Sequence, residues 1–249
     1  MYTYHSISAE VYNLDKPIGT SFGDVEYYSD RLQHVKGKIL EPAVGTGRIL
    51  IPLLEQGFAI EGFDLSEEML DYCRGNLKKA QKEATIYQAN METFQSNQLY
   101  EAIIIPTGTF LLITDDVKAM TSLSNFYHHL EPNGRLIVDI FLQPDFHEGS
   151  SQYRTFTNKQ DELITLQITQ SAINYIEQTT TTHHRYDKWK EGKCIESEFE
   201  IFTLKWYGIQ EFKRLLMQIG FKDIVISSDY CYKQYPTDRN QTITFEAVK

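Results

Sequence analysis

Two features near the start of the chain could together bind a ligand that contains a ribose. The first is the stretch 41–48, in which Gly45 and Gly47 follow a short apolar run and precede a helical pattern. Glycines let the backbone turn sharply and bring the amides at the start of a helix close to a ligand. The second is Asp64, seventeen residues after Gly47 at the expected end of the next strand, where a carboxylate can bind both ribose hydroxyls. Each signal is weak alone, and their joint placement predicts the site.

The details of the glycine turn distinguish between cofactors that contain a ribose. A dinucleotide site of the GxGxxG type needs a small residue three positions after the second glycine, and this chain has Leu50 there. Small residues at 43, 45 and 47 instead follow the acidic Glu41, which suits a ligand with an ammonium group rather than a pyrophosphate. Either signal alone leaves NAD and FAD open, and the combination favours S-adenosylmethionine, a sulfonium nucleotide.

Hydrophobic periodicity places these residues on alternating strands and helices. Apolar runs predict strands at 39–43, 58–63, 84–88, 102–105 and 136–141. Apolar residues at helical spacing predict helices between them, at 49–54, 67–80 and 117–130. Such alternation predicts a mostly parallel sheet with right-handed crossovers. A helix ending at Gly220 and two last strands, 221–227 and 242–248, would complete the sheet.

The pattern changes from about residue 150, where apolar and polar residues begin to alternate. Ile164, Leu166 and Ile168 alternate with polar residues, and no helical pattern returns before residue 208. This alternation predicts antiparallel strands, with a hairpin turn at Glu191 and Gly192. The four threonines at 179–182 are interpreted as exposed strand.

Composition and charge exclude several classes of protein. The 249 residues are 41% hydrophobic and 23% charged, which is typical of a globular chain. The net charge is −10 and no basic stripe stands out, so we expect no nucleic-acid partner. No apolar run is long enough to cross a bilayer, so we expect no membrane partner. Three scattered cysteines without a CxxC pair indicate a cytoplasmic protein with no disulfide framework or zinc site.

Four stretches of the chain resemble the class I S-adenosylmethionine-dependent methyltransferases. They are ILEPAVGTGRILIPLLEQG at 39–57, GFDLSEEML at 62–70, PTGTFLLITDD at 106–116 and LEPNGRLIVDIF at 130–141. The resemblance is greatest to the small-molecule branch, in which an antiparallel insert follows the fifth strand. A helix similar to YGIQEFKRLLMQIGF, here 207–221, then returns the chain to the sheet. The resemblance implies that S-adenosylmethionine is the cofactor and S-adenosylhomocysteine the product.

The same resemblance implies an α/β fold with a Rossmann-like, doubly wound, mostly parallel seven-stranded sheet. An antiparallel β insert and an N-terminal helical lid would complete it. One methyltransferase domain would span 1–249, with the lid at 1–36, the core at 37–149 and 207–249, and the insert at 150–206 over the acceptor site.

Carried over by position, the resemblance implies a set of cofactor-binding residues. Glu41 would face the methionine ammonium, Arg48 would lie near the methionine carboxylate, and Asp64 would hold the ribose. The other implied residues are Tyr28 in the lid, Ala43, Gly45 and Gly47 under the methionine part, Leu65, Met69, Asn90, Met91 and Glu92 around the adenine, and Pro106. Two positions depart from the family: Ala43 replaces a glycine, which requires a negative φ there, and Asn90 replaces the common Asp. For Tyr28, packing in the core is the alternative.

The acceptor side is less marked in the sequence. Methyl transfer from a sulfonium is an in-line displacement that depends mainly on holding the two reactants in line, so a dedicated base is optional. Adjacent histidines, at 128–129 and 183–184, point apart on a helix or strand, so neither pair predicts a base or a metal site. The residues expected around the acceptor are Tyr12, Thr109, Phe110, Tyr186 and Trp206.

Several functions remain compatible with these residues. We expect transfer to an N or O nucleophile of a small-molecule acceptor, by a monomer or a homodimer. A binding protein that keeps the cofactor site without turnover is one alternative. An NAD-linked oxidoreductase is another, and Leu50 disfavours it.

Overall fold

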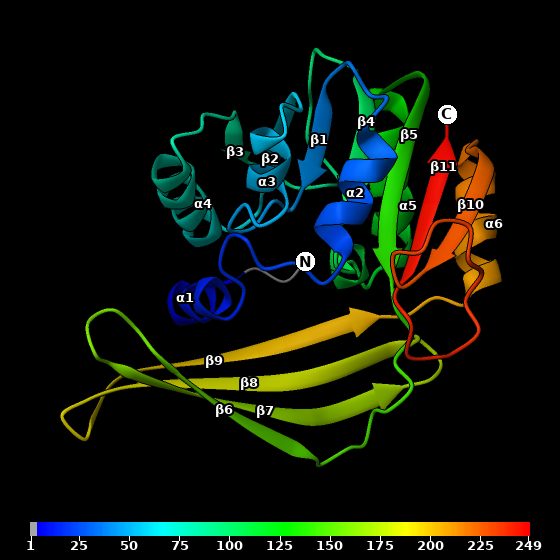
Figure 1. Cartoon of the computed structure of the whole chain (residues 1–249). Coiled ribbons are helices and arrows are strands. Elements are labelled where there is room, and N and C mark those ends of the chain that lie inside the picture. The colour runs from blue at the N-terminus through cyan, green and yellow to red at the C-terminus, as the bar shows by residue number, and fades with distance from the viewer. Residues whose placement is uncertain (1–3) are drawn as a thin grey trace.

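The structure is a computed structural model that describes residues 4–249, and its strands form two sheets (Figure 1). The helices are α1 (Ser6–Asp15), α2 (Asp24–Leu32), α3 (Leu50–Glu55), α4 (Glu67–Ala80), the 3-10 helix η1 (Thr109–Leu112), α5 (Asp116–His129) and α6 (Ile209–Ile219). The strands are β1 (Ile39–Pro42), β2 (Ile60–Asp64), β3 (Ile86–Gln88), β4 (Tyr100–Ile105), β5 (Leu130–Ile140), β6 (Ser151–Thr157), β7 (Leu163–Asn174), β8 (Thr179–Lys190), β9 (Lys193–Lys205), β10 (Lys222–Ser228) and β11 (Ile243–Val248).

The larger sheet has seven strands in the order β10-β11-β5-β4-β1-β2-β3. The five strands from β1 to β5 pair in parallel. The last strand, β11, lies between β5 and β10 and runs antiparallel to both. This arrangement confirms the predicted Rossmann-like, mostly parallel seven-stranded sheet.

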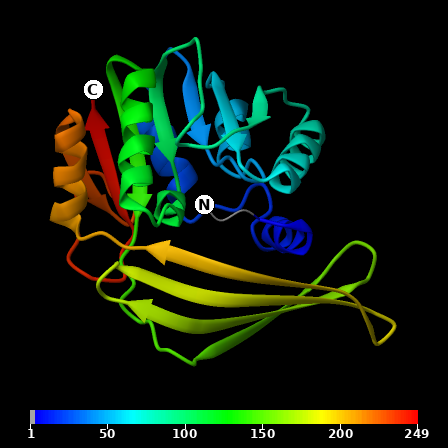
Figure 2. The same cartoon turned by 180° about the vertical axis from the view of Figure 1, so that it is seen from behind.

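Helices cover both faces of this sheet, as Figure 1 and the reverse view in Figure 2 show. Side chains alternate along β4: Ile103 and Ile105 pack in a core cluster with α5 and α6, while Ala102 and Ile104 pack in a second cluster with α2, α3 and α4. A central strand that is buried on both faces must be apolar throughout, which explains the run at 102–105.

Several strands differ in length from their predictions, and β5 differs most. It starts at Leu130 instead of residue 136, whereas β3 is limited to residues 86–88 and β4 starts at Tyr100 instead of residue 102. Residues 132–134, between the predicted helix and strand, lie within β5 at an irregularity where the pairing with β4 jumps from Leu130 to Arg135. They form a bulge with a φ of 65° at Asn133, and the strand pairs on both sides of it.

The second sheet lies across the carboxyl ends of the parallel strands (Figures 1 and 2). Its four strands are antiparallel in the order β6-β7-β8-β9 and lie within the segment expected as the insert. Glu191 and Gly192 join β8 to β9 with φ values of 50° and 74°, as a two-residue hairpin turn requires. The predicted hairpin is confirmed.

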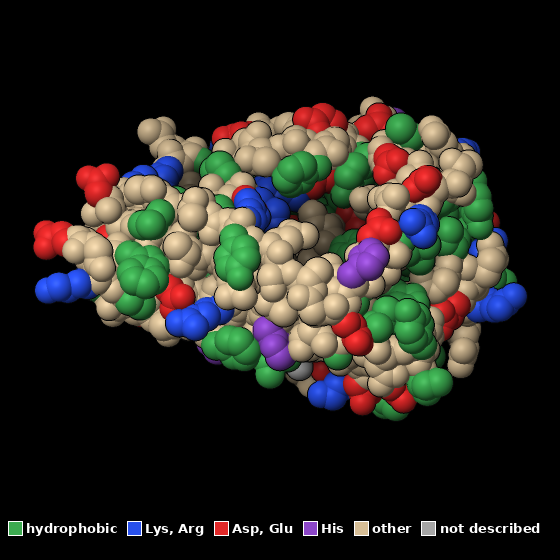
Figure 3. Space-filling view, turned by 90° about the horizontal axis from the view of Figure 1, so that it is seen from below, with side chains coloured by type: hydrophobic (Ala, Val, Ile, Leu, Met, Phe, Trp, Pro, Cys, Tyr) green, Lys and Arg blue, Asp and Glu red, His purple; other side chains and the backbone are tan. Residues whose placement is uncertain are grey.

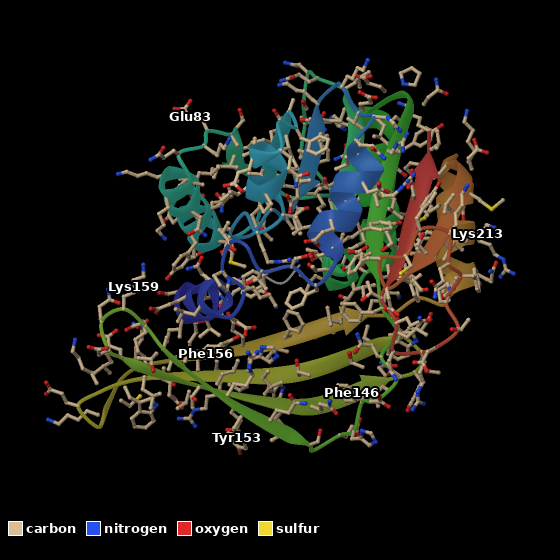
Figure 4. All side chains as sticks on the ribbon, viewed as in Figure 1. Glu83, Phe146, Tyr153, Phe156, Lys159 and Lys213 are labelled. Atoms are coloured by element: carbon tan, nitrogen blue, oxygen red, sulfur yellow. The ribbon has the colours of Figure 1, made fainter. Side chains whose placement is uncertain are left out.

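One face of the second sheet is turned toward α1 and the other toward solvent. Figure 4 shows Phe156 on the side of α1 and Tyr153, which is 73% exposed, on the opposite face. Residues 179–182 are in a strand, as expected, but the expected exposure is wrong: Thr180 is 3% exposed and the other three threonines are half-buried. Strand β8 lies between β7 and β9, so every second threonine points inward.

Helix α1 packs between α4 and the second sheet. Ile7 and Val11 on α1 form a small core cluster with Ile164, Leu166 and Tyr186 of the sheet. On its other side, α1 contacts α4, where the Asn76 side-chain amide donates a hydrogen bond to Asn13 Oδ1 at 2.9 Å. The helix therefore contacts both parts of the fold.

Carboxylates of β9 bind the first turn of α1. Glu198 accepts hydrogen bonds from the backbone amides of Ile7 at 3.1 Å and Ser8 at 3.2 Å. Glu200, which is buried, accepts bonds from the His5 amide and from the Ser8 hydroxyl, the latter at 2.6 Å. The first amides of a helix have no partner within the helix and carry partial positive charge, so two carboxylates from the sheet stabilise the helix there.

A buried carboxyl near the end of β5 holds the loop that follows β4. Asp139 Oδ2 accepts a hydrogen bond from the Thr107 amide at 2.8 Å and from the Tyr230 hydroxyl at 3.2 Å, and Oδ1 accepts from the Thr244 hydroxyl at 2.7 Å. Thr107 has a φ of 58°, which L-residues rarely adopt, so this bond fixes an unfavourable conformation. Burial raises the pKa of Asp139 to about 6, although these hydrogen bonds oppose the rise.

The raised pKa predicts a pH-dependent stability. Relative to Asp139→Asn, the unaltered chain should lose roughly 1.4 kcal/mol of unfolding free energy between about pH 5 and about pH 8. A carboxyl with a folded-state pKa of about 6, against 3.8 when unfolded, favours folding fully at low pH, and this contribution declines as the pH rises through 6. Urea unfolding of both chains at both pH values measures the difference. The exposed Asp223→Asn is the control, and parallel curves for the unaltered chain and Asp139→Asn would contradict the prediction.

Candidate functional site

A cavity of about 220 Å³ lies where the parallel strands end and the second sheet begins. We call it the main cavity. Its wall comes from both sheets, from the loops after the parallel strands and from the N-terminal segment. The lining residues are Tyr4, Tyr12, Lys16, Ala43, Gly45, Phe63, Asp64, Leu65, Met69, Ala89, Met91, Thr107, Gly108, Thr109, Leu112, Phe141, Phe202 and Leu204. Ligands of open α/β sheets bind at this edge.

The glycine turn between β1 and α3 lines the cavity with backbone. Gly45 has a φ of 56°, and a Cβ there would contact only Met69 Cε, at 3.7 Å. Gly47 has a φ of 84°, and a Cβ there would lie 2.9 Å from Cys73 Sγ, so this glycine lets α3 and α4 pack closely. Ala43 has a φ of 55°, which corrects the expectation of a negative value. An alanine in this region costs roughly 1 to 2 kcal/mol, so the turn is strained.

Asp64 ends β2 with its carboxylate in the cavity wall. Oδ2 accepts a hydrogen bond from the Gly45 amide at 2.8 Å, and Oδ1 accepts one from the Ser66 amide at 2.9 Å. Burial raises the pKa of this carboxyl, while the backbone hydrogen bonds from Ser66 and Gly45 lower it. These two amides fix the carboxylate in one orientation, and each oxygen has a further lone pair for a ligand.

A second cavity of about 30 Å³ adjoins the first, and we call it the side cavity. Its wall includes Glu41, Arg48, Pro106, Thr107 and part of the glycine turn. Glu41 is 2% exposed, and its Oε2 has no hydrogen-bond partner among residues 4–249. Burial raises the pKa of Glu41 well above its ordinary value, and Arg48 opposes the rise. A buried carboxylate oxygen without a partner is costly, and a cationic ligand would relieve that cost.

Arg48 is held by a residue that sequence reasoning missed. Its guanidinium forms a buried two-point ion pair with Asp24, with Nη1 to Oδ1 at 3.1 Å, and also donates to the Thr20 carbonyl at 3.1 Å. Asp24 follows Gly23 at the start of α2, and nothing in the local sequence marks it as the partner of Arg48. Arg48 therefore already has a carboxylate partner in Asp24, and a ligand carboxylate expected near Arg48 would compete with it.

The residues expected around the adenine divide into two groups. Leu65, Met69 and Met91 line the main cavity. Asn90 and Glu92 do not: Asn90 Oδ1 accepts a hydrogen bond from the Glu92 amide at 2.8 Å. An Asn side chain commonly bonds the backbone two residues on, so Oδ1 of Asn90 is engaged within this turn. The carboxylate of Glu92 lies 3.8 Å from Lys118 Nζ. The neighbouring Ala89 lines the cavity in their place.

The structure corrects the expected position of Tyr28. This residue is fully buried in the core cluster of α2, α3 and α4, with its ring against Tyr27, and it does not line either cavity. Core packing, the alternative for this residue, describes its position. The aromatic residues that the N-terminal segment contributes to the main cavity are Tyr4 and Tyr12.

The residues expected around the acceptor also divide. Tyr12 and Thr109 line the main cavity, and Phe110, Tyr186 and Trp206 do not. Phe110 packs against Phe212 and Tyr207 in the core, because the 3-10 helix turns its side chain away from the cavity. Tyr186 packs under α1, and Trp206 packs against Tyr175.

The cavity wall contains residues that the sequence did not single out. Phe141 follows β5, and Phe202 and Leu204 are inward-facing residues of β9. The alternation along 194–204 marks two sets of side chains, and only the position of the second sheet decides which set faces the cavity.

Comparison with known proteins agrees with this site. A family model described as "Methyltransferase domain" matches residues 39–134. The chain is 26% identical to "Putative methyltransferase YqeM" of Bacillus subtilis, over 86% of this chain and 85% of that protein. It is 28% identical to a Streptomyces venezuelae protein, "dTDP-3-amino-3,4,6-trideoxy-alpha-D-glucopyranose N,N-dimethyltransferase", over 43% of this chain and 44% of that protein.

Solved structures share the fold over nearly the whole chain. An S-adenosylmethionine-dependent methyltransferase of Clostridium acetobutylicum superimposes with a TM-score of 0.75 at 14% identity, covering 96% of both chains. DesVI of Streptomyces venezuelae gives a TM-score of 0.73 at 17% identity and covers 99% of both. The chain therefore contains a methyltransferase domain at residues 39–134, and over nearly its whole length it shares the fold of solved S-adenosylmethionine-dependent methyltransferases.

Proposed function

We propose that this enzyme transfers the methyl group of S-adenosylmethionine to an amine nitrogen of a small-molecule acceptor. The observation that supports this proposal most directly is the composition of the main cavity, which is mostly apolar and bordered by Phe202 and Leu204 of the second sheet. The size of the cavity limits which acceptor groups can reach the cofactor. The titratable groups in its wall limit which nucleophiles can be methylated there.

The residues of both cavities fit the cofactor. Asp64, oriented by two amides, would accept hydrogen bonds from the ribose hydroxyls, and Leu65 and Met69 would pack on the adenine. The unpartnered Oε2 of Glu41 would bind the methionine ammonium in the side cavity. Because Gly45 leaves space free of side chains at the turn, the methionine part can lie against its backbone.

The chain contributes alignment and exclusion of water to the reaction. S-adenosylmethionine supplies an electrophilic methyl group when it is bound. The cavity walls hold the acceptor in line with that group, and alignment of this kind contributes up to about 7 to 11 kcal/mol. The apolar walls also exclude water, which strengthens the few polar contacts inside.

The cavity favours an amine over a hydroxyl as the nucleophile. The titratable residues of its described wall are Tyr4, Tyr12, Lys16 and Asp64, and they include no imidazole. Burial raises the pKa of both tyrosines, so they stay protonated and cannot act as bases, and we assign Asp64 to the ribose. A neutral amine has its own lone pair and needs no base for the attack, whereas an alcohol does.

The names of several relatives support this choice. The Streptomyces venezuelae relative is an N,N-dimethyltransferase. A mouse "Glycine N-methyltransferase" is 28% identical over 43% of this chain, and "Glycine/sarcosine N-methyltransferase" of Aphanothece halophytica is 24% identical over 80% of it.

We also propose a cytoplasmic location for the enzyme. Cys73, Cys194 and Cys231 are all free, as in proteins of reducing compartments. Within residues 4–249, every helix is too short or too polar to cross a membrane.

The role of Asp64 predicts a large loss of cofactor affinity. Asp64→Ala should weaken binding of S-adenosylhomocysteine and of methylthioadenosine alike, by about 30-fold or ~2 kcal/mol, because both contain the ribose. Calorimetry with the two ligands measures this. The exposed Glu83→Ala (Figure 4) is a control that should bind normally, and unchanged affinity in Asp64→Ala would refute the assignment.

The role of Glu41 predicts a loss that depends on the ligand. Glu41→Gln should weaken S-adenosylhomocysteine about tenfold and methylthioadenosine less than about twofold, because the latter lacks the ammonium. Since burial raises the pKa of Glu41 and a bound cation lowers it, binding should also release protons. Calorimetry in two buffers of different ionisation enthalpy detects this release, which Glu41→Gln should reduce. Equal losses of affinity for the two ligands would show that Glu41 does not bind the methionine ammonium.

The choice of an amine predicts a characteristic pH dependence. The rate of S-adenosylhomocysteine formation, as kcat/KM, should rise about tenfold per pH unit up to the pKa of the acceptor amine, because only the free amine reacts. Acceptors with lower amine pKa values should move the bend to lower pH. Turnover of matched alcohols at similar rates would contradict an amine-specific reaction.

The position of the second sheet predicts which aromatic residue controls the acceptor. Phe202→Ala should lower kcat/KM for the best acceptor at least about tenfold and leave cofactor affinity within about threefold, since it removes part of the wall. Trp206→Ala, which changes a residue outside the cavity, is the matched control and should alter neither value. Equal effects of the two variants would show that the sheet does not cover the acceptor.

A further inference from the structure

Lys16 contributes to the wall of the main cavity, and its ammonium has no carboxylate partner among residues 4–249. It follows the last turn of α1, and its Nζ lies 4.6 Å from the centroid of the Tyr12 ring. No ion pair joins this ammonium to a carboxylate of residues 4–249. The Tyr12 ring compensates only a small part of the lost hydration, since a contact of this kind contributes about 0.5 to 2 kcal/mol.

The charges around Lys16 leave its own charge uncompensated. The nearest acidic neighbour, Asp15, forms an ion pair with Arg154, and the carboxylate of Asp24 is bound to Arg48. Burial lowers the pKa of Lys16, Arg48 and Arg154 lower it further, and Asp15 alone opposes them. Both nearby guanidinium groups thus have carboxylate partners of their own, whereas Lys16 has none in the described part of the chain.

The position of Lys16 separates it from the proposed methionine site. Lys16 lines the main cavity, together with Phe202 and Leu204 of the second sheet. It does not line the side cavity, where Glu41 and Arg48 lie. Its side chain therefore belongs to the part of the wall that the second sheet also forms, outside the side cavity.

We propose that Lys16 binds an anionic oxygen group, a carboxylate or a phosphate, carried by the acceptor. The proposal rests on the proposed function, because it concerns the acceptor of that reaction. With a net charge of −10, the protein as a whole does not attract anions, so an anionic acceptor depends on a local cation. Figure 3 shows a hollow in the face that carries the second sheet, with Lys or Arg side chains at its rim. A lysine acts as a point charge and suits either anion.

Anion binding can be measured without turnover. We would titrate the S-adenosylhomocysteine-loaded protein with inorganic phosphate and, separately, with acetate, and follow amide chemical shifts by NMR. Saturable shifts near Lys16 are expected with at least one anion. Lys16→Met should weaken that binding about tenfold, and Lys16→Arg should retain it within about threefold. The exposed Lys159→Met, in the turn between β6 and β7 (Figure 4), is the matched control and should bind like the unaltered chain.

Comparison of the two anions, and of two pairs of matched acceptors, shows whether the acceptor carries a phosphate or a carboxylate. If phosphate binds more strongly, 2-aminoethyl phosphate should be methylated faster than ethanolamine. If acetate binds more strongly, glycine should be methylated faster than glycinamide. Lys16→Met should abolish the preference for the charged member of the pair. Absence of saturable binding by both anions would overturn the proposal.

One further result would also overturn the proposal. If Lys16→Met weakened S-adenosylhomocysteine but not methylthioadenosine, Lys16 would bind the carboxylate of the cofactor instead. Failure of the proposed function itself would be separate, because the unaltered chain would then not bind S-adenosylhomocysteine. The anion titration would in that case be carried out on the unloaded protein.

Discussion

Three carboxyl groups, those of Glu41, Asp64 and Asp139, are buried where strands of the parallel sheet end. Taking a carboxylate out of water is costly, and the three groups differ in the hydrogen bonds that offset this cost. Asp64 accepts backbone amides, and Asp139 accepts an amide and two hydroxyls. One oxygen of Glu41 accepts nothing from residues 4–249. The position and shape of the cofactor site depend on this burial of charge.

The hydrogen-bond partners of these three carboxyl groups distinguish the group with a structural role from the groups that are available to a ligand. Asp139 uses its hydrogen bonds to hold Thr107 in a strained conformation, and Thr107 lines both cavities. Asp64 is oriented but has lone pairs left, and Glu41 is buried with one oxygen unpaired. A ligand with two hydroxyls and an ammonium group matches what these residues leave unsatisfied, which supports the proposal that S-adenosylmethionine binds at this edge.

Local signals in the sequence predicted the larger sheet and the backbone of the site, and they failed where distant segments meet. The turn containing Gly45 and the strand end at Asp64 each depend on residues within a few positions in the chain, so both can be predicted from the local sequence. Tyr28 and Phe110 are aromatic residues near the site in sequence, but the direction of each side chain follows from helix packing, and both point into the core. The partner of Arg48 and the inward face of β9 depend on contacts between segments far apart in the chain, and no local pattern encodes them.

The carboxylates that bind the first turn of α1 also constrain the order in which the molecule can be assembled. The hydrogen bonds from Ile7 and Ser8 to Glu198 join residues 191 and 190 positions apart, and the one from His5 to Glu200 joins residues 195 apart. Closing so long a loop is slow and must await synthesis of β9, although α1 is synthesised well before it. Tyr12 and Lys16 reach their final positions with α1, so residues translated before the rest of the cavity wall complete it among the last.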